Sequence, residues 1–345
     1  MKQSEYIKKL ITCRRLTTDV MQISDSRIVS ILERSYKDLE SLLKLKEVDS
    51  LTYKSYAERK AAIGQLIRQL STSVNVTTRL GIRSTAENVT DIYRTLTETY
   101  AKSQGFSFNW GVAFNTVPTQ VIRTVAGRVW MDGMNFSDRI WRLDDFANKG
   151  VNDIVTSGIS RGESAVNMSK RLRQYLMNEE ITPGTSWTTG IKPSVTGQGS
   201  VHYNALRLAR TEINNAYRET LVQTNEANPI TLGVKWNLSG SHPQPDICDV
   251  WAEADLYGFG SGVYPAGMTP IDHPNGLCFL TQVLRPASQW NDEKANPEMQ
   301  DVSKDELLSV MDGQSDARRN AAWNQFNAVN NMLQSDKFQL NRRVA

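Results

Sequence analysis

Apolar residues recur at helical spacing over the first hundred positions of the chain. Side chains three and four positions apart form one stripe over residues 28–43 and another over residues 56–70. A third helical segment follows over residues 85–103. Because such stripes pack against one another in bundles, the pattern predicts an N-terminal helical bundle or hairpin over residues 1–110.

Small polar residues mark the expected beginnings of several helices. Ser24 and Asp25 precede the first stripe, and Ser50 precedes the second, so each offers an oxygen for an N-cap. Near the C-terminus, Ser303 and Glu306 form a capping-box pattern ahead of a short apolar segment. A short helix is therefore expected after Ser303, followed by a last helix over residues 317–333.

The helical pattern stops between residues 104 and 118, where Gly, Asn and aromatic residues replace it. We place the first domain boundary there. Helices are expected again over residues 119–131, 143–156 and 164–176. Residues 182–200 are rich in Gly, Pro, Ser and Thr, and the length of this stretch predicts a mobile or docking arm rather than a compact connection.

The clearest helix is expected over residues 202–226, with apolar residues on one face and basic and polar residues on the other. Alternating apolar residues then predict a strand over residues 232–238, and a second strand begins at Leu277. The loop over residues 239–276 joins the two strands. Since it holds two of the three histidines, this loop carries most of the candidate chemistry.

Together these elements predict a mostly α fold of the α+β class. An N-terminal helical bundle is expected over residues 1–110. A central helical domain over residues 118–287 is closed by a small β-sheet with a long clasped loop, and residues 288–345 form a C-terminal helical tail.

Composition adds little to this picture but narrows the class of protein. The chain has 345 residues, of which 39% are apolar, enough for a buried core and more than one domain. Its apolar runs are too short to cross a membrane, and the N-terminal segment MKQSEYIKKLITCRR lacks the apolar stretch of a signal peptide. Three cysteines predict free thiols or metal ligands rather than a disulfide framework. We therefore expect a protein of a reducing cytoplasm, with no membrane partner.

Charge is unevenly distributed along the chain. Residues 1–110 carry 18 Lys and Arg against 12 Asp and Glu, whereas residues 241–345 carry 8 against 14. A basic N-terminal part and an acidic C-terminal part suit a protein that lies between nucleic acid and other proteins. The candidate contacts to phosphate or to a protein partner are Arg161, Lys170, Arg171, Arg173, Arg207, Arg210 and Arg218.

Four segments in the second half of the chain carry a resemblance to a known family. They are the helix RLARTEINNAY over residues 207–217, a strand that contains Trp236, the segment HPQPDICD over residues 242–249, and the segment HPNGLC over residues 273–278. In this order and spacing they resemble the Mu F-like phage head morphogenesis family, the minor head proteins of tailed bacteriophages.

Residues 140–176 also resemble the helical lead-in of that family, so the likeness extends over residues 120–287. The resemblance implies a structural minor head (capsid) protein rather than an enzyme. Such a protein lies inside the capsid near the portal and acts in head morphogenesis, with a role in DNA packaging or ejection. It would be found in the virion and, during assembly, in the host cytoplasm. Its implied partners are the portal protein, the major capsid or scaffold protein, and packaged DNA through sequence-independent contacts.

The family commonly carries paired cysteines in both loop segments, and this chain departs from both pairs. What remains is Cys248, His273 and Cys278, with His242 or Asp246 as a fourth ligand for zinc. In the alternative interpretation, the two cysteines are small buried residues and His273 holds the Pro-rich turn by hydrogen bonding. We favour this alternative, and expect no cofactor, because loss of half of the paired cysteines leaves a metal with few ligands.

Two enzymatic alternatives depend on short motifs. Asp272, His273 and Pro274 resemble the start of a nuclease metal finger, but that chemistry needs further histidines downstream, and the sequence has none after His273. The segment 71–73 with Arg210 suggests an ADP-ribosyltransferase site, but no Glu-x-Glu or Gln-x-Glu follows on a plausible strand. The remaining alternative is a nucleic-acid-binding or nuclease-type protein delivered with the phage DNA. We expect no enzymatic activity.

Overall fold

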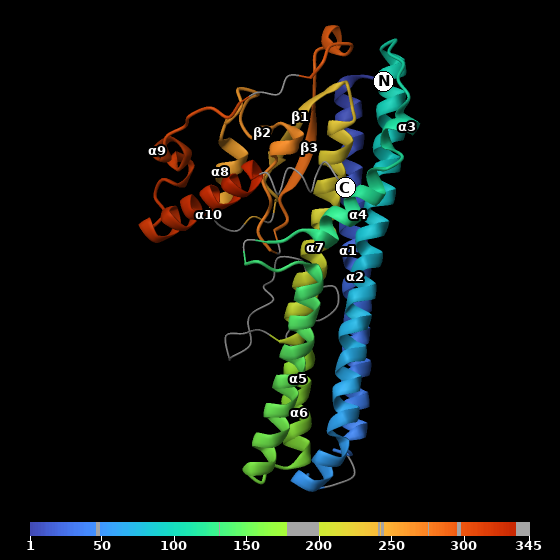
Figure 1. Cartoon of the computed structure of the whole chain (residues 1–345), viewed down its shortest axis with the longest axis vertical. Coiled ribbons are helices and arrows are strands. Elements are labelled where there is room, and N and C mark those ends of the chain that lie inside the picture. The colour runs from blue at the N-terminus through green and yellow to red at the C-terminus, as the bar shows by residue number, and fades with distance from the viewer. Residues whose placement is uncertain are drawn as a thin grey trace. The chain divides into compact units, whose positions relative to one another are not determined.

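The structure is a computed structural model of the chain, and most of it is helical (Figure 1). One three-stranded antiparallel sheet accompanies the helices, so the fold is mostly α of the α+β class, as the sequence predicted. The structure describes residues 1–45, 49–130, 132–177, 200–240, 242, 245–274, 276–294 and 298–335. The expected arm over residues 182–200 lies outside these described residues except for Ser200.

The chain forms two compact units, and each is built from segments that are not consecutive. Unit 1 comprises Met1–Val20, Ile82–Gly133 and Glu212–Ala345, and unit 2 comprises Met21–Gly81 and Met134–Thr211. The boundaries that we expected near residues 110 and 287 do not coincide with these units. The reason is that three long helices, α1 (Gln3–Leu42), α2 (Tyr53–Ser103) and α7 (Val201–Glu226), each contribute residues to both units.

The two N-terminal helices are longer than the sequence pattern indicated. Helix α1 spans Gln3–Leu42 and helix α2 spans Tyr53–Ser103. Ser24 and Asp25 therefore lie within α1 and cap nothing, and the expected third helix is the last part of α2. Both helices extend because buried side chains continue beyond the stripes that we recognised.

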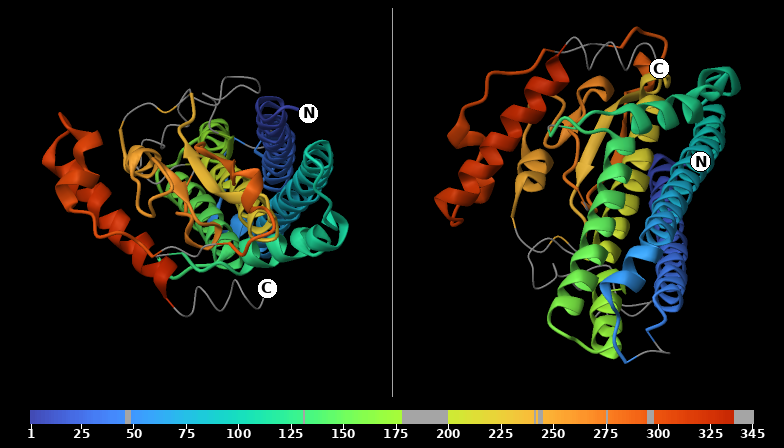
Figure 2. Two further views of the ribbon diagram at one scale, coloured as in Figure 1. Left: turned by 90° about the horizontal axis from the view of Figure 1, so that it is seen from above. Right: turned by 60° about the horizontal axis from the view of Figure 1, so that its bottom comes forward.

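Unit 2 is a bundle of helices around an apolar core. It contains helix α5 (Phe136–Ser160), helix α6 (Ala165–Met177) and the first part of helix α7 (Val201–Glu226), with parts of α1 and α2. Helices α5 and α6 are in contact and lie side by side (Figure 2). The core includes the buried side chains of Ile28, Leu32, Ile63, Ile67, Val151, Leu172 and Ala205.

Unit 1 is organised around the sheet, whose strand order is β2-β1-β3. Strand β1 spans Thr231–Asn237, β2 spans Val263–Tyr264 and β3 spans Phe279–Leu284. The two longer strands are the two that the sequence predicted, and β2 arises inside the loop that joins them. Trp236 of β1 pairs with Leu280 of β3. Unit 1 also contains α3 (Trp110–Phe114) and α4 (Val117–Gly127).

Helices cover both sides of this sheet. The unit 1 part of α7 lies on one side, and helices α8 (Ile247–Glu253) and α10 (Asp316–Gln334) lie on the other (Figures 1 and 2). Trp251 of α8 stacks on Phe326 of α10, with ring centroids 5.0 Å apart. These aromatic contacts extend the core of unit 1 toward the C-terminal segment.

The C-terminal segment follows the expectation closely. Helix α9 spans Lys304–Leu307, and the Ser303 side chain accepts a hydrogen bond from the Glu306 amide, which confirms the expected cap. Three short 3-10 helices complete the described elements, η1 (Ala266–Met268), η2 (Ala287–Gln289) and η3 (Ser309–Met311). None of the described helices combines the length and the hydropathy needed to cross a membrane.

Candidate functional site

Helix α8 fixes the first group of polar residues in the loop between β1 and β3. Asp246 is the N-cap of this helix, and its Oδ1 accepts a hydrogen bond from the Cys248 amide at 2.7 Å. Asp249 closes the capping box, since its Oδ2 accepts from the Asp246 amide at 2.8 Å. The cap therefore sets the positions of two carboxylates and one thiol relative to one another.

His242 joins this group from the loop that precedes α8. Its Nε2 lies 2.8 Å from Oδ2 of Asp249, and its Nδ1 lies 4.0 Å from Sγ of Cys278. Burial favours the neutral imidazole, but the hydrogen bond to Asp249 and the charges of Asp246 and Asp249 outweigh it and raise the pKa of His242. The Asp249 contact orients the ring so that Nδ1 faces the thiol.

His273 approaches from the opposite end of the loop. Its Nε2 lies 3.4 Å from Oδ2 of Asp246 and 3.6 Å from Oδ1 of Asp272, and its Nδ1 lies 3.2 Å from the Pro274 carbonyl oxygen. Burial opposes the charged ring, yet the hydrogen bond to Asp246 and the charges of Asp272 and Asp246 raise the pKa of His273 to about 9. His273 thus links the HPNGLC segment, in which it lies, to the HPQPDICD segment.

The two cysteines lie at the centre of the group. Cys248 and Cys278 are both buried and free. Cys248 Sγ donates to Oδ1 of Asp272 at 3.4 Å. The interaction with Cys248 is the main cause that lowers the pKa of the Cys278 thiol.

A buried ion pair connects helix α7 to the loop. Arg218 NH1 lies 3.0 Å from Oδ2 of Asp272, and the Arg218 guanidinium lies 3.9 Å from the centroid of the Trp236 ring. Arg218 is only 5% exposed. The expectation that Arg218 lies on a phosphate-binding surface is therefore wrong, because this side chain balances the charge of Asp272 inside unit 1.

Two more side chains attach the second half of the loop to the helices. Asn214 Nδ2 donates to the Gly276 carbonyl oxygen, and Arg14 NH2 donates to the Leu277 carbonyl oxygen, both at 2.9 Å. A Cβ atom added at Gly276 would overlap the Asp272 carboxylate. A side chain at position 276 would therefore displace the Asp272 carboxylate, which contacts Arg218.

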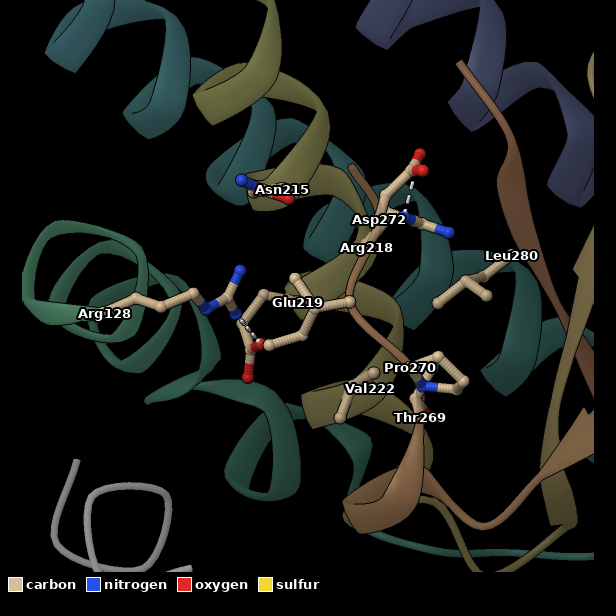
Figure 3. Close-up of a pocket in the computed structure, with 10 residues that line it drawn as sticks. Arg128, Asn215, Arg218, Glu219, Val222, Thr269, Pro270, Asp272 and Leu280 are labelled. Atoms are coloured by element: carbon tan, nitrogen blue, oxygen red, sulfur yellow. Dashed lines mark hydrogen bonds and ion pairs between the residues drawn. The ribbon is translucent and has the colours of Figure 1, made fainter. Parts of the chain in front are cut away.

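A small cavity lies next to the ion pair of Arg218 and Asp272 (Figure 3). A second buried ion pair, Arg128 with Glu219 at 2.7 Å, lines it as well. The cavity has a volume of about 20 Å³. Because a cavity needs a volume of at least roughly 10–15 Å³ to hold one water molecule, this cavity is suited to ordered water rather than to a substrate.

The other basic candidates lie in unit 2. Arg171 contacts Glu163 and Arg210 contacts Asp25, each pair at 2.8 Å. Arg210 is an internal partner of α1 in unit 2, with its side chain only 12% exposed, so it is not available as a surface contact as expected. Arg207 is half-buried beside Tyr203. The exposed members of the expected set are Arg161, Lys170 and Arg173.

The structure brings three of the expected metal-ligand candidates into one group, since ligand atoms of Asp246, Cys248 and His273 lie within 4.8 Å of one another. His242 forms a separate group with Asp246 and Asp249, and Cys278 Sγ lies 4.0 Å from Nδ1 of His242. The sequence analysis missed Asp249, although the Asp-x-x-Asp spacing of its capping box was a usable signal. Thiols, imidazoles and carboxylates at this spacing can hold a divalent metal ion or form a pH-sensitive ion-pair network.

No family model, no curated protein and no solved structure matches this chain.

Proposed function

We propose that this chain is a structural, non-enzymatic minor head protein of a tailed bacteriophage. It acts inside the capsid near the portal, in head morphogenesis. Its partners are the portal protein and the major capsid or scaffold protein. The proposal starts from the resemblance of residues 120–287 to the Mu F-like family and is supported by how the resembling segments meet in unit 1.

One observation carries the proposal, namely that these segments are connected by direct side-chain contacts. Asn214 of the RLARTEINNAY helix donates to the carbonyl oxygen of Gly276 in the HPNGLC segment, and His273 of that segment lies 3.4 Å from Asp246 of the HPQPDICD segment. Trp236 of the strand contacts Arg218, the residue that follows the RLARTEINNAY segment. Segments that are separate in the sequence thus form a single unit, as expected if they evolved as one structural motif.

The geometry of the site favours a scaffold over an enzyme. Its two thiols are 0% and 1% exposed, so a substrate cannot reach them in this conformation. Polar groups of α7 make internal contacts, such as Arg218 with Asp272 and Asn214 with Gly276, and residues 211–225 are buried throughout. Buried polar contacts of this kind help to specify one arrangement of a core.

A role in contacting packaged DNA is an extension of this proposal. Arg161, Lys170 and Arg173 are the exposed basic side chains that support it. Contacts of this kind to phosphates are independent of sequence and weaken as salt increases. They suit a protein in a head filled with DNA and would equally serve the alternative, a nucleic-acid-binding protein delivered with the genome.

Quantitative mass spectrometry of purified particles tests the proposal. Particles are treated with external protease, and the amounts of this chain, the portal protein and the major capsid protein are compared before and after disruption of the head. We expect a protected protein with a copy number far below that of the major capsid protein. Absence from both mature particles and proheads would overturn the structural role, and DNA binding and nuclease assays on the purified chain would then decide the alternative.

A further inference from the structure

Three donor atoms of the loop lie close to the separations that a tetrahedral metal site requires. Zinc bonds of 2.0–2.3 Å place neighbouring ligand atoms roughly 3.3–3.8 Å apart. Nε2 of His273 lies 3.4 Å from Oδ2 of Asp246, and the pair joins Cys248 Sγ in a group that spans no more than 4.8 Å. The group therefore needs only a small contraction to close around an ion.

A fourth donor adjoins these three. Cys278 directly precedes β3, its Sγ lies 4.0 Å from Nδ1 of His242, and its thiol interacts with the Cys248 thiol closely enough for each to shift the pKa of the other. Two sulfur atoms, one imidazole and one carboxylate form a donor set that suits zinc. Calcium and magnesium prefer sites made only of oxygen atoms, so the thiols exclude them as the preferred ions.

The histidine ligand is oriented by its neighbours. Nδ1 of His273 lies 3.2 Å from the Pro274 carbonyl oxygen, so a proton on Nδ1 leaves the Nε2 lone pair directed at the other donors. The two oxygen atoms of the Asp246 carboxylate also have different partners. Its Oδ1 accepts from the Cys248 amide, while its Oδ2 faces His273 and remains available.

We infer that Asp246, Cys248, His273 and Cys278 bind one zinc ion, which clasps the loop between β1 and β3 to the end of the sheet. Binding breaks the two S–H bonds and releases both protons to solvent, so the ion is held by two thiolates, one carboxylate and one neutral imidazole. Asp246 and His273 are 42% and 33% exposed at their side chains, which gives the ion a path from solvent.

The alternative that we favoured from the sequence, buried cysteines without a metal, accounts for less of the structure. It explains why Cys248 and Cys278 are buried and why His273 contacts the Pro274 carbonyl oxygen, but it gives no role to the convergence of the Asp246, Cys248 and His273 ligand atoms within 4.8 Å. Cys13 shows the contrast, since it is equally buried in unit 1 and burial raises the pKa of its thiol to about 12. The zinc inference does not depend on the proposed role in the phage head.

Metal analysis of the purified full-length chain tests the inference. The chain is produced in zinc-supplemented medium, kept reduced, and its zinc content is measured by inductively coupled plasma mass spectrometry. We expect about one zinc per chain in the parent protein. The matched control is Cys13→Ser, which removes a buried thiol of the same unit and should retain the zinc.

Substitutions of the proposed ligands should reduce the zinc content. Cys248→Ser removes a ligand and should weaken zinc binding by more than the roughly 10–100-fold that loss of an outer-shell partner costs. Because this buried substitution can also disturb folding, the partly exposed ligands are tested with His273→Gln and Asp246→Asn, with circular dichroism as the check on folding. Cobalt offered in place of zinc should give a sulfur-to-cobalt charge-transfer absorption that decreases in Cys278→Ser.

Three results would overturn the inference. The first is a reduced, folded parent protein that holds no more zinc than His273→Gln. The second is loss of zinc in Cys13→Ser together with its retention in Cys248→Ser. The third is a Cys248–Cys278 disulfide in protein that has been freshly purified under reducing conditions. Because the virion measurement uses a different readout, failure of zinc binding and failure of the head role can be told apart.

Discussion

Two histidines, the half-buried His273 of unit 1 and the buried His202 of unit 2, meet opposite electrostatic environments. In unit 1, burial opposes charge on His273, but Asp246 and Asp272 outweigh it and raise its pKa to about 9. In unit 2, burial dominates at His202, Arg210 adds to it, and the pKa falls to about 4. Burial alone therefore does not set the direction of the shift, and nearby carboxylates decide it.

The two units also differ in the interactions that stabilise each of them internally. Unit 1 buries ion pairs and hydrogen-bonded side chains along α7, such as Arg128 with Glu219 at 6% and 2% side-chain exposure. Unit 2 depends on apolar side chains such as Leu172, and its pair of Arg210 with Asp25 is more exposed, at 12% and 15%. Unit 1 should thus be more sensitive than unit 2 to the loss of a buried charge, whereas each unit has an apolar core that should be sensitive to the loss of apolar volume.

The largest effect is expected from Glu219→Gln in unit 1. It leaves the Arg128 charge buried without its counter-charge, which costs roughly 3–5 kcal/mol for a buried pair. Urea unfolding followed by circular dichroism gives the free energy of unfolding. The matched variant in unit 2 is Asp25→Asn, which should cost less because water reaches that pair. Equal losses in the two variants would show that the units do not differ in this respect.

Leu172→Ala tests the apolar core of unit 2. Leu172 is 0% exposed, and removing its side chain leaves a cavity that costs roughly 2–5 kcal/mol. The same substitution at Val166, which is on the same helix but 59% exposed, should change stability by no more than about 0.5 kcal/mol. Thermal or urea denaturation compares the two variants. A small loss for Leu172→Ala would mean that apolar packing does not dominate in unit 2.

The lowered pKa of His202 should make the free energy of unfolding depend on pH. His202 titrates near 6.5 when unfolded and at about 4 when folded, so the folded state resists protonation. The stability that this shift contributes is present above pH 6.5 and is lost as the pH falls toward 4, by roughly 2–3 kcal/mol at most. His202→Gln should remove this loss. Unfolding free energies measured between pH 7 and pH 4 in both proteins check it, and an unchanged slope in the variant would refute the assignment.

Much of the fold followed from local patterns in the sequence. The 3.6-residue and two-residue periods of apolar side chains predicted the helices and the two longer strands, and Ser303 predicted a cap that the structure contains. These signals succeed because they depend on neighbours in the chain. The positions of helix ends were less well predicted. Ser24 and Asp25 look like caps, but the apolar side chains that continue on both sides keep them inside α1.

The candidate site was partly predictable. The sequence identified Cys248, His273 and Cys278 as chemically unusual, but it did not show that Asp249 orients His242 or that Asp272 connects the thiol to helix α7. Those contacts join residues from different parts of the loop and from the helix before it. No local pattern records such distances, because they depend on how the loop crosses the sheet.

Arg218 marks the limit most clearly. By itself, the sequence determined the helix on which Arg218 lies, its charge and the presence of apolar residues on one face of that helix. Only the tertiary structure decided that the opposite face is also buried, with Arg218 between Asp272 and Trp236 rather than in solvent. Helical periodicity reports which side chains share a face, whereas burial of a charge depends on whether a distant segment supplies the counter-charge that offsets its desolvation.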